Sequence, residues 1–147
     1  RQVGTSGNRQ GPTAESPRRA SQRLRRPGCL CGYHASMSRI RKCLLVGHCG
    51  ADAFSLESLV SRACPGLQVF HESDQGTLER EAKSEALLLV NRLLDGSFAC
   101  DEGTELMGRL RGFAAEAGIE PATMMLISNF EDAQRAAKEA GAIKGFG

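Results

Sequence analysis

The stretch Ala86-Leu-Leu-Leu-Val-Asn91 decides the fold. Its first five residues are all apolar, a pattern typical of a strand that is covered on both faces of a parallel sheet. Three further apolar runs predict strands, over Lys42–Val46, 67–70 and 122–127. Residues 145–147 predict the opening of a fifth strand. The sequence therefore predicts five strands, with 86–91 near the centre of the sheet.

Helical patterns separate these strands. The first helix carries Phe54, Leu56, Leu59 and Val60, with Asp52 or Ser55 as its N-cap. The other three helices are predicted over 74–84 with Ser73 or Asp74 as N-cap, 102–117 ending at Gly118, and 130–140 with Asn129 as N-cap. Alternating strands and helices predict an α/β fold, a flavodoxin-like, doubly wound parallel five-stranded sheet of order 2-1-3-4-5.

Charge divides the 147 residues into two parts, although the net charge is only +2. Residues 1–36 contain seven arginines and one glutamate, which gives +6, whereas the remaining twelve basic and sixteen acidic residues give −4. We predict a disordered Arg/Gly/Pro-rich tail over 1–38 and one domain over 39–147. The acidic domain disfavours nucleic acid as its partner, and no apolar run is long enough for a membrane span.

Both ends of the sequence prompt further expectations. Met37 directly precedes the ordered pattern, so one hypothesis is that translation starts there and that residues 1–36 are upstream sequence. No final helix follows the fifth strand, so we expect a C-terminally truncated sequence whose sheet exposes apolar surface.

The six cysteines do not form the pattern of a small secreted disulfide scaffold, because the chain has enough apolar runs for a core. Without a secretory signal, we expect reduced thiols and a cytoplasmic protein. Cys29, Cys31 and His34 have unsuitable spacing for a structural zinc site and lack a fourth ligand. Cys49 follows His48 at a predicted helix start, where a thiol can become reactive, which leaves a small redox or ligand-binding flavodoxin-like protein as an alternative.

Ligands of such sheets bind beyond the carboxyl ends of the strands. The residues expected at this edge follow the first, third and fourth strands: Gly47, His48 and Cys49, then Asn91 and Arg92, then Ser128 and Asn129. They are the first candidates for a functional site.

The segments KCLLVGH, ALLLVNRLLDGSF, EGTELMGRLR, TMMLISN and FEDAQRAAKEAGA, in this order, resemble the receiver domains of two-component response regulators. The resemblance covers residues 39–147 and implies a signalling module. It also implies a site with an acidic pair and an aspartate that hold Mg²⁺, the aspartate accepting a phosphoryl group, and a hydroxyl that binds it.

The resemblance places the acidic pair at Gly47 and His48 and the phospho-acceptor at Asn91, so only the hydroxyl, at Ser128, is retained. We therefore predict a pseudo-receiver with a degenerate phosphorylation pocket, no metal site, no cofactor and no enzymatic activity. The alternative is a phosphorylatable receiver whose acceptor is relocated to Asp95, four residues beyond Asn91.

By the same resemblance, the protein is expected to act in signal transduction through a protein partner or a homodimer. The surface would be formed by the helix of residues 130–140 and the fifth strand. Its partner-facing residues would be Phe130, Gln134 and Lys138.

Overall fold

The computed structural model describes residues 39–147. They form a five-stranded parallel sheet in the order β2-β1-β3-β4-β5, which confirms the predicted topology. The strands are β1 (Lys42–Val46), β2 (Gln68–Glu72), β3 (Ala86–Asn91), β4 (Thr123–Ile127) and β5 (Ile143–Phe146). The helices are α2 (Gly50–Ala63), α3 (Gln75–Glu81), α4 (Gly103–Ala117) and α5 (Glu131–Glu139).

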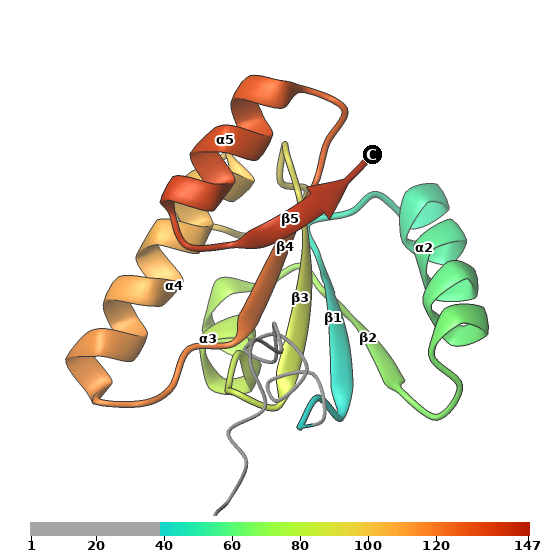
Figure 1. The fold of residues 1–147 in the computed structure, drawn as a ribbon, viewed down its shortest axis with the longest axis horizontal. Helices are drawn as coiled ribbons and strands as arrows, with labels where there is room; N and C mark the ends of the chain where they lie inside the picture. The colour runs from blue at the N-terminus through green and yellow to red at the C-terminus, as the bar shows by residue number, and fades with distance from the viewer. Residues whose placement is uncertain (1–38) are drawn as a thin grey trace, which may run out of the picture. The chain divides into compact units, whose positions relative to one another are not determined.

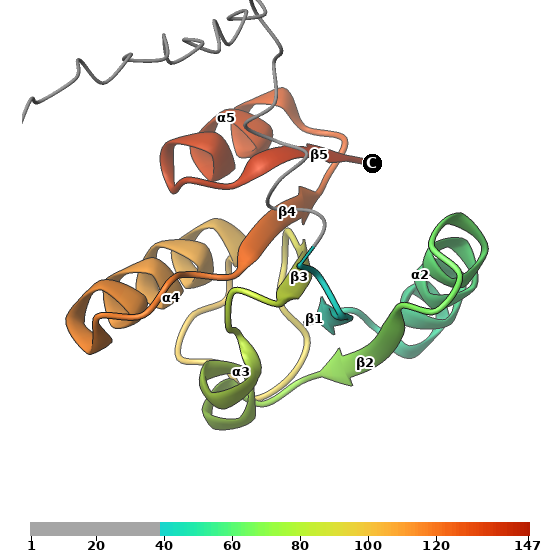
Figure 2. The ribbon, with the colours of Figure 1, turned by 60° about the horizontal axis from the view of Figure 1, so that its bottom comes forward.

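Helices lie on both faces of the sheet, but unequally (Figure 1). α3, α4 and α5 cover one face, and α2 lies on the other, next to β1 and β2 (Figure 2). The larger core cluster, on the three-helix face, includes Leu88, Leu106 and Met107, each fully buried. The smaller cluster, on the α2 face, is built around Cys43, Leu45 and Leu89.

The α2 face is only partly covered by the described residues. Leu87, Met125 and Ile127 pack against the smaller cluster but stay half-buried. Within 39–147, α2 is the one helix on this side, and apolar side chains of β3 and β4 remain partly exposed.

Local capping signals were read correctly in two helices. The Asp74 side chain accepts a hydrogen bond from the Thr77 backbone N–H at 2.8 Å, so Asp74 is the N-cap of α3. Gly118 ends α4 in the left-handed conformation, with φ of 65°, which glycine adopts without the usual penalty. α3 is shorter than predicted, since it ends at Glu81.

The predicted N-caps of the other two helices are wrong. α2 begins at Gly50 after Cys49, and the Ser55 hydroxyl donates to the Ala51 carbonyl inside the helix. α5 follows Phe130, and the Ser128 hydroxyl accepts from the Phe130 N–H. Nearby Ser, Asp and Asn residues compete for the same helix start, so sequence alone does not select one.

Several predictions lie outside the described residues: the basic tail, the Cys29, Cys31 and His34 group, and translation from Met37. Among the described helices, none combines the length and apolar character that crossing a bilayer requires.

Candidate functional site at the carboxyl edge

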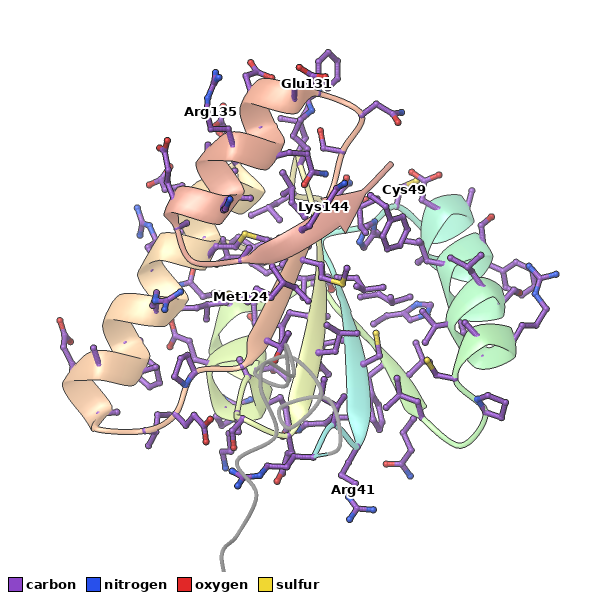
Figure 3. All side chains as sticks on the ribbon, in the orientation of Figure 1. Arg41, Cys49, Met124, Glu131, Arg135 and Lys144 are labelled. Atoms are coloured by element: carbon purple, nitrogen blue, oxygen red, sulfur yellow. The ribbon has the colours of Figure 1, made fainter. Side chains whose placement is uncertain are left out.

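The sheet brings the sequence-predicted residues together at one edge. β1, β3 and β4 are parallel neighbours, and Asn91 pairs in register with Ile127, so Gly47, Asn91 and Ser128 follow adjacent strand ends. Cys49 and Glu131 lie at this end of the molecule, and Arg41 lies at the opposite end (Figure 3).

Asn91 is engaged on both sides of its amide. Its Nδ2 donates to the Gly47 carbonyl at 3.1 Å, and its Oδ1 accepts from the Arg92 N–H at 2.9 Å. The side chain therefore ties the end of β3 to the end of β1. An amide cannot form an acyl phosphate, and both polar atoms of this amide are engaged within the domain, so Asn91 acts as a structural link.

His48 makes a second link between the same two strands. Its Nε2 lies 3.0 Å from the Leu89 carbonyl, which can only accept, so this nitrogen carries the proton and donates. Burial is the main influence on His48 and lowers its pKa below 6.5, against the opposing effects of the Leu89 carbonyl and Asp52. The ring is therefore favoured in its neutral form.

The loop after β3 folds back over this edge. The Asp95 N–H donates to the Gly47 carbonyl at 3.0 Å, so Asp95 lies beside the end of β1, as a relocated acceptor would require. Leu94 and Phe98 hold the loop against the domain, because both pack against the larger core cluster. It is also joined to the segment after β2, since the Ser97 N–H donates to the Ser73 carbonyl at 2.6 Å.

Ser128 is held in the turn between β4 and α5. Its hydroxyl accepts from the Phe130 N–H at 3.2 Å, and its backbone carbonyl accepts from Gln134 Nε2 at 2.9 Å. Gln134 also donates to the Leu126 carbonyl at 3.2 Å and is half-buried. Its amide is occupied within the domain, so the exposed members of the predicted partner-facing set are Phe130 and Lys138.

The sequence places Arg92 at this edge but does not predict its contact with Phe130 or the hollow beside it. The Arg92 guanidinium lies 4.7 Å from the centre of the Phe130 ring, a cation–π contact between the β3 and β4 ends. A hollow of about 380 Å³ opens beside this pair. It is lined by Arg92, Glu102, Thr104, Phe130, Asp132, Ala133 and Ala136. The lining residues come from separate segments of the sequence, so no local spacing pattern predicts the hollow.

The cysteines differ in access. Cys49 is exposed at the start of α2, whereas Cys43 is buried in β1. Burial, and secondarily the charge of a Cys64 thiolate, raise the pKa of Cys43 to about 12, so this thiol stays protonated at neutral pH. In residues 39–147 no three His, Cys, Asp or Glu side chains gather closely enough to ligate one metal ion.

No protein-family model and no curated protein matches this chain. Solved structures do. One is a response regulator from Burkholderia pseudomallei, solved with a phosphorylated aspartic acid, calcium ion and citrate, at a TM-score of 0.51 and 16% identity. The match covers 72% of this chain and 58% of that protein, so the chain spans under two thirds of it.

Two shorter structures match over more of their length. The signal receiver domain of a DNA-binding response regulator from Colwellia psychrerythraea 34H has a TM-score of 0.52 and 14% identity, over 71% of this chain and 84% of that one. The phosphorylated cyanobacterial phytochrome response regulator RcpA has a TM-score of 0.51 and 16% identity, over 73% and 79%. The described part of this chain therefore has the fold of response-regulator receiver domains.

Proposed function

We propose that this chain is a receiver-like signalling module of the two-component type that is not phosphorylated. In this proposal it acts in the cytoplasm through protein–protein interaction, without enzymatic activity and without a bound Mg²⁺. The fold supports the signalling class, and the chemistry of the carboxyl edge supports the loss of phosphorylation.

The observation that carries the proposal is the role of Asn91. Its amide donates to the Gly47 carbonyl and accepts from the Arg92 N–H. A phospho-acceptor needs a carboxylate with an open path to the phosphoryl donor, and Mg²⁺ needs further carboxylate oxygens beside it. Here the neighbouring positions are Gly47 and His48, and the proton on His48 Nε2 points to the Leu89 carbonyl.

The interaction half of the proposal rests on the start of α5. Phe130 is 57% exposed, a large fraction for an aromatic side chain, and Lys138 is exposed on the same helix. Aromatic residues are enriched at protein interfaces because they bury a large area with few rotatable bonds.

An amide NMR titration of the full chain tests the loss of phosphorylation. Mg²⁺ is added first, followed by beryllofluoride as a phosphoryl mimic. We expect the signals of Gly47, Asn91 and Ser128 to stay in place, because no carboxylate replaces Asn91. Saturable shifts at these positions would contradict the proposal.

The Asp95→Asn variant tests whether Asp95 is a relocated phosphoryl acceptor. If the wild-type chain responds to beryllofluoride and this variant does not, Asp95 is the acceptor and the chain is a phosphorylatable receiver. Asp101→Asn, on the same loop, is the matched control.

A further inference from the structure

The hollow between the starts of α4 and α5 has a lining of mixed chemistry. Glu102, directly before α4, and Asp132, in the first turn of α5, bring two carboxylates to it from different elements. Phe130 contributes a largely exposed aromatic ring, and Ala133 and Ala136 contribute apolar surface. A volume of about 380 Å³ is enough for one long side chain or a small ligand.

The charges around the hollow favour a cation. Asp101 and Glu131 are exposed next to the two lining carboxylates in the sequence. Arg92 is the basic group in the lining, and Arg135 lies one turn further along α5 (Figure 3). Another nearby base, Arg109, is paired with Glu105 at 2.8 Å. The lining thus holds two carboxylates and one base, and the flanking residues add two further carboxylates and one further base.

An anion is the competing occupant, because two helices begin here and Arg92 is present. A helix start carries only about half a positive charge, which an acidic side chain in the first turn offsets. α5 has Glu131 and Asp132 there, and Asp132 Oδ1 already accepts from the Ala133 N–H at 2.8 Å. α4 has Glu105 in its first turn. The helix ends are therefore already neutralised by the chain's own carboxylates.

We propose that this hollow binds an arginine or lysine side chain of a protein partner, held against the Phe130 ring and between Glu102 and Asp132. The inference rests on the proposed interaction function and names the chemistry of the partner. One face of Phe130 carries Arg92, and a second cation stacks on the ring's remaining exposed surface. The two carboxylates accept charge-assisted hydrogen bonds from it.

The test uses N-acetyl-arginyl-arginine amide as the probe and amide NMR of the full chain as the readout. In every sample, five arginines near the N-terminus are changed to Gln so that they do not compete with the probe peptide: Arg18, Arg19, Arg23, Arg25 and Arg26. We expect shifts at Thr104, Phe130 and Ala133. The corresponding citrulline peptide, which has the same shape without the charge, should leave these signals in place.

Variants identify the groups responsible. Glu102→Gln combined with Asp132→Asn should raise the dissociation constant about tenfold, since two charge-assisted hydrogen bonds become neutral ones. Glu116→Gln, an exposed carboxylate near the other end of α4, is the matched control and should leave it unchanged.

The Arg92→Gln variant tests whether the hollow prefers a cation or an anion. It should tighten binding of the arginine peptide about threefold, because a like charge leaves the lining. The inference is overturned if this variant weakens binding, if the citrulline peptide binds equally well, or if N-acetyl-glutamyl-glutamate amide shifts these signals instead. None of these outcomes alters the Mg²⁺ and beryllofluoride titration, so the proposed function is judged separately.

Discussion

Two neighbouring parts of the carboxyl edge differ in how their polar groups are used. At the ends of β1 and β3, Asn91 and His48 form side-chain hydrogen bonds to backbone carbonyls, and the loop carrying Asp95 closes over them. At the start of α5, Phe130 is exposed beside a hollow, with Arg92 stacked on its ring. The first part joins strands together, whereas the second presents side chains to solvent.

This difference shows that polar groups at one edge of the same fold can serve two different ends. Two backbone carbonyls at this edge accept hydrogen bonds from side chains, that of Gly47 just after β1 and that of Leu89 within β3. Asn91 and His48 satisfy these carbonyls by donating, which a carboxylate cannot do. These two side chains therefore join the ends of β1 and β3, whereas Phe130 on the adjoining surface stays exposed.

The largest effect is expected at Gly103, where α4 approaches the end of β3. A Cβ there would overlap the carbonyl oxygen of Asn91 and lie 2.9 Å from Val90 Cγ1. Because backbone atoms must move, Gly103→Ala should lower the free energy of unfolding by about 3 kcal/mol in urea denaturation.

Gly108→Ala is the control for this substitution. It lies on the same helix, and a Cβ there meets nothing within 4 Å. The variant should be more stable by up to about 1 kcal/mol, because alanine favours the helix. If Gly103→Ala were as stable as Gly108→Ala, helix propensity, not the close approach to β3, would govern the result.

Asn91→Ala removes the link between β1 and β3. It leaves the Gly47 carbonyl with the Asp95 N–H alone and takes away the acceptor of the Arg92 N–H. We expect a loss of about 2 kcal/mol in the free energy of unfolding, since two partly buried hydrogen bonds disappear. Asn129→Ala, an exposed asparagine at the same edge, should change stability little; an equal loss there would contradict the structural role of Asn91.

His48 makes stability depend on pH. Its pKa is lowered in the folded protein, so the unfolded chain binds the proton more readily. The stabilisation is complete above a pH of about 6.5 and is lost as the pH falls through the folded-state pKa. His48→Gln keeps a donor for the Leu89 carbonyl and removes the titration.

Thermal melts of both proteins across this pH range check the sign. The wild-type melting temperature should fall more steeply towards acid than that of His48→Gln. His71→Gln, at the exposed surface of β2, serves as the histidine control. Parallel slopes for wild type and His48→Gln would rule out burial of the neutral ring as the cause.

The smallest effect on stability is expected at Phe130, on the exposed surface at the start of α5. Phe130→Leu removes the ring on which Arg92 stacks but keeps an apolar side chain. The loss in unfolding free energy should be about 0.5 kcal/mol, as for other exposed cation–π pairs. A loss as large as that of Asn91→Ala would mean that this surface is part of the core structure and is not presented to a partner.

The sequence was sufficient to predict most of the fold. Short apolar runs such as 86–90 have the length of a buried strand and are too short for a helix. Their alternation with helices favours a parallel sheet. The C-cap Gly118 was also found, since it stands alone at its helix end, and the N-cap of α3 was narrowed to Ser73 or Asp74, of which Asp74 is correct. Where several capping residues crowd together, as at 128–130, the choice depends on the path of the chain.

The site was predicted only in part. Placing Gly47, His48, Asn91 and Ser128 at one edge follows from topology. The carbonyls that accept from Asn91 and His48 are more than 40 residues away in the sequence, however, and no local pattern encodes them. The same holds for the hollow beside Phe130, whose lining comes from three separate segments. The register of the loop that brings Asp95 to Gly47 also depends on Leu94 and Phe98 packing against the core.

The most direct test of the central claim is the intact mass of the full chain after incubation with acetyl phosphate and Mg²⁺. The account predicts no added phosphoryl group, for the wild-type chain or for Asp95→Asn, while a phosphorylatable receiver treated in parallel gains one. A phosphoryl adduct on the wild-type chain that disappears in Asp95→Asn would contradict the account and establish Asp95 as a relocated acceptor.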